Sequence, residues 1–378
     1  MAATATTLVH VESKQTAVPT LVTGAGRTLP ITVPSGPPLT AAALQRRFRA
    51  VLYYGGAGDA EQQQQVEEER AAWVKESLSA ALTDHPKMAG RLRRRRGGGD
   101  QDDEGLWEVK LNDNGVRLVL ASVDMSMTAF LEAKDLQSKE AALALWTDVD
   151  WQEPEFCAPF FMQLTRFQDG GYAIGACCSL LLADPLSLVD FLKAWARTHA
   201  KMQAQMNHVA PAVIQYTRYF QSPGAARRLK SVPLDSCSAA VAPTTVLFRA
   251  AAAADAQDRH ALAAACLDQA VEKLGSNAKK PPRFAVLAAD GGSSGGMTVA
   301  RTCDYVWDGE TTAPPSRSRH ALRAAYWHEV GLGEIALDGS EPVHVSCSVV
   351  SPCADEGLVV VMPAASGDDL FISATVPN

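Results

Sequence analysis

The 378-residue chain lacks several features that would place it in a class at once. No apolar run approaches the roughly 20 residues of a membrane-spanning helix. The first ten residues have neither the charged start nor the long apolar core of a secretion signal. A net charge of −7 gives no whole-chain basis for nucleic-acid binding. We therefore expect a protein of the cytoplasm without a transmembrane segment, free in solution or held at a membrane by a partner.

Spacings typical of metal and nucleotide sites are also missing. The eight cysteines form no C-x-x-C pair, and Cys177 and Cys178 stand in an apolar run. We expect free thiols that act as small apolar residues, and no metal site. The glycine-rich stretch 290–296 has neither G-x-G-x-x-G nor P-loop spacing, so it predicts a loop and not a phosphate cradle.

Positive charge is concentrated in one short run, in which five arginines occupy six positions from Arg91 to Arg96. Such a run is typical of an anion or nucleic-acid site, or of a solvated hairpin. Acidic residues follow at once within 100–104 and can neutralise the run. We therefore favour the hairpin.

Hydrophobic residues make up 47% of the chain, as in globular proteins, and the length suits two domains. Strands and helices alternate, which predicts two α/β layers. We place an N-terminal domain at 1–205, a crossover linker at 206–243 and a shortened C-terminal domain at 244–378. The principal elements predicted are strands at 48–54, 160–167, 342–350, 357–363 and 369–376, a hairpin at 106–121 turning at Asn114–Gly115, helices at 61–82, 128–136 and 254–274, and a turn with a strand within 326–336.

The most informative stretch is 172–199. Its first half predicts a buried strand from Ile174 to Leu182, and its second half an amphipathic helix. Asp184 can cap that helix with its carboxylate, and Pro185 suits the first helical position. The helix face comprises Leu188, Phe191, Leu192, Trp195 and His199.

This stretch resembles the H-x-x-x-D-G motif of the plant BAHD acyltransferases. Asp184 stands in the Asp position, Leu180 in the His position and Pro185 in the Gly position. The second family signature, D-F-G-W-G-K-P, falls on 336–342, where Pro342 alone is retained. Both signatures are thus degenerate. The resemblance implies that the catalytic base is missing and that Asp184 has a structural role, and it leaves no catalytic residue assigned.

Within that family the chain is most similar to the Eceriferum/Glossy wax-biosynthesis branch, through 48–54, 112–117, 159–167 and the closing strands. The resemblance implies two similar chloramphenicol-acetyltransferase-like α/β domains with a tunnel between them. It implies a monomer that assists very-long-chain fatty acid elongation for cuticular wax at the cytosolic face of the endoplasmic reticulum. The implied partner is a condensing enzyme of the 3-ketoacyl-CoA synthase type. The implied ligand is a long acyl chain or acyl-CoA, with no bound cofactor.

A second function stays open, an acyl-CoA-dependent O- or N-acyltransferase that uses a relocated or dispensable base. Leucine cannot accept a proton, so another group must act. His10 and His344 lie on predicted strands and are candidates, whereas His199 lies about five helical turns beyond the motif. A third reading is a decayed paralogue without a stable role.

Overall fold

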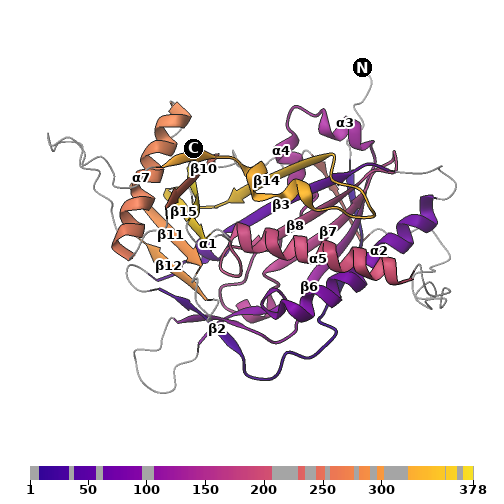
Figure 1. Cartoon of the computed structure of the whole chain (residues 1–378), viewed down its shortest axis with the longest axis horizontal. Coiled ribbons are helices and arrows are strands. Elements are labelled where there is room, and N and C mark those ends of the chain that lie inside the picture. Colours follow the sequence, from indigo (N-terminus) through magenta and orange to yellow (C-terminus); the bar gives the residue numbers. More distant parts are fainter. Residues whose placement is uncertain are drawn as a thin grey trace.

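The computed structural model shows two β-sheets with helices packed against them (Figure 1). The fold is mixed α/β, as the sequence predicted. The described residues are 8–33, 38–56, 63–95, 106–206, 229–234, 244–251, 256–275, 281–289, 296–301, 322–353, 355–363 and 369–377. The glycine-rich stretch 290–296 and the acidic run 100–104 lie almost wholly outside them.

The first sheet has seven strands in the order β14-β3-β8-β7-β6-β1-β9. Its interior strand β8, between β3 and β7, is buried along its whole length. The strands are β1 (Leu8–Ala17), β3 (Arg47–Tyr54), β6 (Val116–Val123), β7 (Phe160–Arg166), β8 (Tyr172–Ser179), β9 (Lys230–Pro233) and β14 (His344–Val350).

The second sheet has nine strands in the order β13-β10-β16-β15-β11-β12-β2-β5-β4. Strands β15 and β16 form the hairpin expected at the end of the sequence. The strands are β2 (Thr28–Thr32), β4 (Arg91–Arg94), β5 (Trp107–Lys110), β10 (Thr244–Ala251), β11 (Arg283–Ala289), β12 (Met297–Arg301), β13 (Arg323–Ala325), β15 (Glu356–Pro363) and β16 (Asp369–Val376).

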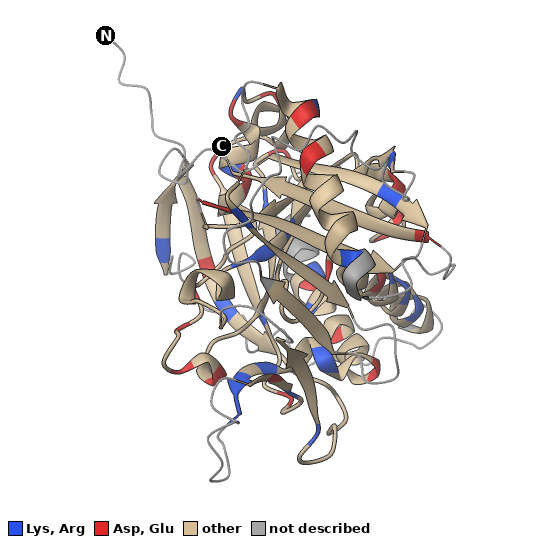
Figure 2. Ribbon diagram, turned by 90° about the vertical axis from the view of Figure 1, so that its left-hand side faces the viewer, with Lys and Arg blue, Asp and Glu red and all other residues tan. Residues whose placement is uncertain are grey.

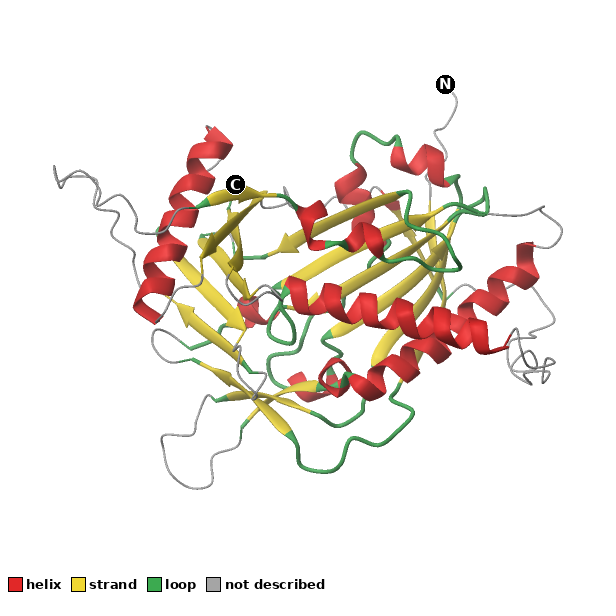
Figure 3. Ribbon diagram, viewed as in Figure 1, coloured by secondary structure: helices red, strands yellow, loops and turns green. Residues whose placement is uncertain are grey.

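Three long helices cover the sheets (Figure 3). Helices α2 (Gln63–Asp84) and α5 (Pro185–Met206) lie together over one face of the first sheet, and α7 (Ala256–Leu274) packs on the second. Buried apolar residues fill the space beneath each helix, and another cluster covers the opposite face of the first sheet. The short helices are α1 (Ala41–Leu44), α3 (Met127–Leu131) and α4 (Leu136–Lys139), and the 3₁₀ turns are Pro86–Ala89, Glu140–Ala142, Pro154–Phe156, Trp327–Val330 and Leu332–Glu334.

Strands from both ends of the chain enter both sheets. Strand β14 pairs with β3 at the edge of the first sheet, although almost 300 residues separate them. Conversely, β2 pairs with β12 in the second sheet and carries β5 and β4 with it. The linker predicted at 206–243 lies mostly outside the described residues. The division into 1–205 and 244–378 and the tunnel between the halves stay predictions.

The hairpin predicted at 106–121 is wrong. Strand β5 belongs to the second sheet and β6 to the first, so the chain crosses between sheets at 111–115. The turn chemistry is present, because Asp113 and Gly115 both have positive φ. Buried Arg91 binds the carbonyl oxygens of Asn114 and Gly115 at 2.8 Å. This guanidinium holds the loop that crosses between the sheets. A local turn signal shows that the chain turns, but it cannot show which strands pair on either side of the turn.

Two smaller expectations also need correction. The segment 326–336 contains two 3₁₀ turns and no strand, because its strand, β13, ends at Ala325 before the segment begins. The helix predicted at 128–136 is broken into α3 and α4. Helix α3 ends after one turn at Leu131, and the residues that follow it, 132–135, are mostly exposed, so few apolar contacts extend the helix.

Candidate functional site

The corner between β8 and α5 is a closed apolar turn. Strand β8 ends at Ser179, three residues earlier than predicted. The Ser179 carbonyl accepts hydrogen bonds from the backbone N–H of Leu182 and Ala183 at 3.0 and 3.1 Å. All four side chains of 180–183 are buried. The chain therefore leaves the strand through a turn whose side chains point into the core.

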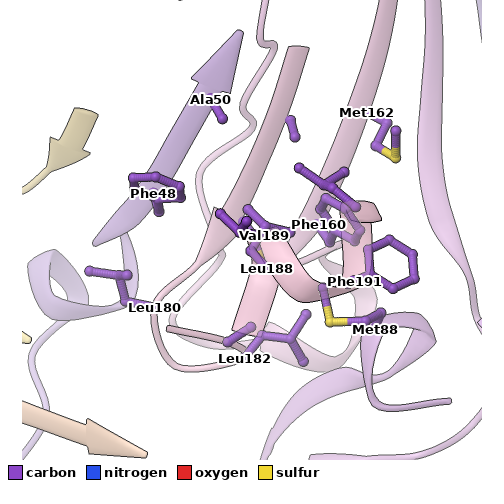
Figure 4. Close-up of a cluster of buried hydrophobic side chains, with 14 of the residues drawn as sticks. Phe48, Ala50, Met88, Phe160, Met162, Leu180, Leu182, Leu188, Val189 and Phe191 are labelled. Carbon is purple, nitrogen blue, oxygen red and sulfur yellow. The ribbon is translucent and has the colours of Figure 1, made fainter. Parts of the chain in front are cut away.

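Leu180 occupies the position at which the resemblance places a histidine. Its side chain is fully buried, and Figure 4 shows it beside Phe48 in the apolar cluster beneath α5. Its backbone N–H donates to the Arg46 carbonyl at 3.0 Å. A leucine side chain here packs against carbon and neither accepts nor donates a proton.

Asp184 caps α5, as the sequence predicted. One carboxylate oxygen, Oδ1, accepts from the backbone N–H of Leu186 at 2.9 Å and of Ser187 at 3.1 Å. The other, Oδ2, accepts from the Ser187 hydroxyl. Pro185 is the first helical residue, where no N–H is needed. Both oxygens are thus satisfied at a helix N-terminus, where the dipole also favours negative charge.

A buried ion pair lies on the chain just before β3. The guanidinium of Arg46 binds the carboxylate of Glu356, and both side chains are almost fully buried. Arg46 precedes β3 of the first sheet, and Glu356 begins β15 of the second. The pair therefore ties the sheets together close to the corner. The carboxylate of Glu356 is thus already engaged by the Arg46 guanidinium.

Neither candidate for a relocated base lies near the corner. Within β3, Arg47 pairs with Ser179 of β8, whereas Tyr53 pairs with His344. Six residues separate Arg47 from Tyr53, which is about 20 Å along a strand. Followed across the sheet, the pairing of β1, β6, β7 and β8 aligns His10 with Tyr172. Tyr172 is at the opposite end of β8 from the corner, and His10 lies three strands away from β8. The structure does not bring either imidazole to Leu180.

His10 instead takes part in a hydrogen-bonded group of its own. It is fully buried, with Nδ1 at 2.7 Å from the Ser231 hydroxyl and Nε2 at 2.6 Å from the Asp124 carboxylate. Ser231 is exposed on edge strand β9, directly opposite His10. A hydroxyl, an imidazole and a carboxylate in this order are the arrangement that activates a serine in acyl-transfer enzymes.

The clearest polar centre of the described residues surrounds Asp338. Its carboxylate accepts from Arg70 at 2.8 Å, from Gln203 at 2.8 Å and from His199 at 3.2 Å, and the Tyr172 hydroxyl lies 3.3 Å away. Burial raises the pKa of this carboxyl, but the hydrogen bonds from His199, Arg70 and Gln203 outweigh burial and hold the pKa well below its usual range.

This centre joins several elements and is closed on its inner side. The other ring nitrogen of His199 is 2.9 Å from the Ser77 hydroxyl, which also accepts from the Trp195 indole at 2.9 Å. Arg70 stacks over the Tyr172 ring at 4.1 Å. Helices α2 and α5, strand β8 and the loop at 338 are therefore held to one carboxylate. The arrangement is that of a structural anchor.

The cysteines and potential metal ligands offer little reactivity. The six described cysteines are free thiols, as predicted, whereas Cys237 and Cys303 lie outside the described residues. Burial raises the pKa of Cys177 to about 11 and that of Cys347 to about 12, so both stay protonated near neutrality. Within the part of the chain that the structure describes, no three metal-ligating side chains cluster, and no helix is long and apolar enough to span a membrane.

Sequence reasoning did not identify Asp338 or the partners of His10. Asp338 has positive φ and precedes Gly339, and Leu337 pairs with Ser340 around them. Asp–Gly between pairing residues is a recognised tight-turn signal, so the turn was detectable. Its partners were not, because they come from positions up to 268 residues away.

Comparison with known proteins finds that part of this chain is similar to transferases. A family model described as the Transferase family matches residues 59–228, which contain the β8–α5 corner. Putrescine hydroxycinnamoyltransferase 3 of Oryza sativa subsp. japonica is 33% identical over 126 residues, covering 33% of this chain and 26% of that protein. Protein ECERIFERUM 26-like of Arabidopsis thaliana is 30% identical over 127 residues, covering 34% of this chain and 28% of its own length.

Among solved structures, vinorine synthase aligns with 97% of this chain and 94% of its own, at 20% identity and a TM-score of 0.47. The segments matched in the two curated relatives span only about a quarter of those proteins' length, 26% and 28%.

Proposed function

We propose that the chain is a member of the BAHD-type transferase family, whose model matches residues 59–228, and that it assists acyl elongation without performing acyl transfer at the β8–α5 corner. The observation that carries the proposal is the buried Leu180. At the position that the family motif gives to a base, the chain has an apolar side chain packed in the core. The corner itself is kept, because Asp184 caps α5 through both oxygens.

The energetics favour loss of transfer chemistry at this corner. A general base contributes roughly 10²- to 10⁴-fold to a rate. Neither His10 nor His344 reaches Leu180. The Arg46–Glu356 pair nearby has its carboxylate bound to a cation. The retained Asp184 supports the shape of the turn, and its two oxygens already accept three hydrogen bonds.

We infer the biological role from the Eceriferum relatives. The chain assists very-long-chain fatty acid elongation for cuticular wax, through a condensing enzyme of the 3-ketoacyl-CoA synthase type. It acts on the cytoplasmic side of the endoplasmic reticulum. A long acyl chain or acyl-CoA is its ligand, held between the two halves of the fold. Similarity to ECERIFERUM 26-like and ECERIFERUM 2 supports this proposal.

Co-expression with a very-long-chain condensing enzyme tests the elongation role. We expect the full chain to lengthen the acyl products, measured by gas chromatography of fatty acid methyl esters. Leu180→Met should lengthen them equally, because no chemistry is asked of this position. A condensing enzyme without its active-site nucleophile is the control for background elongation. An unchanged chain-length profile with well-expressed, folded protein overturns the role.

The group around His10 favours a second candidate, an acyl-transfer enzyme with a relocated centre. Ser231 would attack a thioester carbonyl while His10 takes the hydroxyl proton, and Asp124 would orient the imidazole. The leaving thiolate would take that proton and depart as a thiol. Water, an alcohol or an amine would then release the acyl group from Ser231.

Release of free thiol from acyl-CoA separates the two candidates. The accessory function predicts no release above the rate of the Ser231→Ala variant. Ser13→Ala, on the same strand as His10, is the matched control for folding and handling. Release that is abolished by Ser231→Ala and His10→Ala but kept by Ser13→Ala would establish the relocated enzyme.

A further inference from the structure

A basic pocket lies at the margin of the second sheet, away from the β8–α5 corner. It encloses about 720 Å³ between strands β2, β4 and β5 and the 3₁₀ turn Pro154–Phe156. A smaller cavity of about 360 Å³, lined mainly by carbon, adjoins it, and Phe156 lines both. The cationic side chains of the larger pocket are Arg93, Arg94, Arg95 and Lys110, and its acidic ones are Glu108 and Glu155.

The cationic side chains of the basic pocket differ in how many partners they contact. Arg93 pairs with Glu108, with Nε at 2.8 Å from the carboxylate. Arg94 stacks on Trp151 at 3.9 Å and donates to its carbonyl at 2.7 Å. Among the described contacts, no hydrogen bond or ion pair engages the side chain of Arg95 or Lys110. Arg95 and Lys110 are therefore the two cations of the pocket that no residue of the described part of the chain engages, and both are available there to an anion.

Large apolar side chains stand exposed around this pocket. Phe156 at its wall is 70% exposed, and Leu106 is 38% exposed and accepts the Arg95 backbone N–H at 2.8 Å. Leu21 and Val22, 69% and 91% exposed, lie on the loop between β1 and β2. That loop runs along the lower edge of the molecule in Figure 1.

Specific contacts fix the apolar loop beside the pocket. The next residue, Thr23, binds the Asp113 carboxylate through its backbone N–H and its hydroxyl, at 2.8 and 2.6 Å. Asp113 lies between two pocket residues, Asn112 and Asn114. Elsewhere, Figure 2 shows basic and acidic positions scattered along the ribbon. The combination of free cations and exposed apolar side chains is thus a local feature.

We propose that this face docks on a membrane that contains anionic phospholipid. Arg95 and Lys110 bind headgroup phosphates, while Phe156, Leu21 and Val22 enter the interface between headgroups and acyl chains. A soluble phosphate compound would use the cations but not the three exposed apolar side chains. An acidic peptide would likewise leave Val22 in water. The proposal is independent of the elongation role, because it involves neither the corner nor a protein partner.

Co-sedimentation with vesicles tests the proposal on the full chain, with the acidic run 100–104 in place. We expect binding to phosphatidylcholine vesicles containing 30% phosphatidylserine and little binding to phosphatidylcholine alone. At about fivefold in affinity for each basic residue, Arg95→Ala with Lys110→Ala should weaken binding about 25-fold. Raising the salt from 0.1 to 0.5 M should weaken the unsubstituted chain also. Lys134→Ala with Lys201→Ala is the matched control, because both lysines are exposed elsewhere.

The apolar contribution needs its own pair of variants. Val22→Ser with Phe156→Ser should weaken vesicle binding at least tenfold, whereas Tyr326→Ser, exposed at a distant site, should not. Unchanged thermal unfolding confirms that each variant is folded. Equal binding to neutral and anionic vesicles overturns the proposal. So does retained vesicle binding in the apolar variant, or full competition by millimolar inorganic phosphate, which would identify a site for soluble phosphate. Binding of polyglutamate in preference to vesicles would identify a protein ligand and also overturn it.

Discussion

The residue that decides the chemistry of this protein is Leu180. Its side chain is buried among apolar side chains, and its backbone N–H donates to the Arg46 carbonyl. The position is therefore optimised for packing. An imidazole placed here would lose its solvation without gaining a partner.

Leu180→His should consequently destabilise the protein and leave it without transfer activity. We expect a loss of about 2–5 kcal/mol in the free energy of unfolding, the range for disrupting a buried leucine. Leu180→Met, which nearly conserves volume, should cost less than about 1.5 kcal/mol. Urea denaturation followed by tryptophan fluorescence measures both. A His variant as stable as the original chain would show that the corner has room for a base.

Asp184 makes a separate contribution through the helix cap. Asp184→Ala should lower the free energy of unfolding by about 0.5–2 kcal/mol, because the N–H groups of Leu186 and Ser187 lose their acceptor. Asp184→Asn keeps an acceptor oxygen and should recover most of that loss. Equal losses in the two variants, in the same denaturation assay, would argue that the charge and not the cap matters.

At the scale of elements, the sequence predicts individual strands and helices better than their pairing. The strand predicted at 48–54 and the helix at 61–82 are both present. The predicted strand runs through Leu182, whereas the strand in the structure ends at Ser179. The prediction was too long because the turn that follows is as apolar as the strand. Composition cannot separate a buried strand from a buried turn. The 106–121 hairpin failed because β5 and β6 find partners in different sheets, a choice made by distant residues.

In the candidate site too, contacts between sequence neighbours could be predicted and contacts between distant residues could not. Asp184 as a cap and the buried face of α5 followed from local spacing, because a cap and its helix are neighbours in sequence. The Asp338 centre did not, because its four partner side chains come from three separate elements, α2, β8 and α5. The Asp338 carboxylate thereby anchors helices α2 and α5 to each other.

That anchor predicts a dependence of stability on pH. The pKa of Asp338 is depressed in the folded state, so its stabilisation is present above the unfolded pKa of about 3.9 and is lost as pH falls below it. Asp338→Asn should be less stable by about 1.5–3 kcal/mol at pH 6, the range for hydrogen bonds to a charged group. The difference should narrow between pH 4 and pH 2. Denaturation at each pH measures it, and a difference independent of pH would contradict this role.

At the scale of the whole molecule, the Arg46–Glu356 pair joins the two sheets. Removing one partner leaves a buried charge, so Arg46→Met and Glu356→Gln should each cost about 3–5 kcal/mol. The double variant should recover part of that loss, because neither charge then remains. A double-mutant cycle in urea measures the coupling. Strictly additive losses would show that the ion pair does not link the sheets energetically.

The exchange of strands between the ends of the chain also sets an order of events during synthesis. Strand β3 is complete early, but the strand that covers its outer edge, β14, begins only at His344. Until β14 has left the ribosome, the edge of β3 that β14 will cover presents unpaired backbone groups to any neighbouring strand. The edge of β3 is thus open to mispairing during the synthesis of the almost 300 residues that separate it from β14.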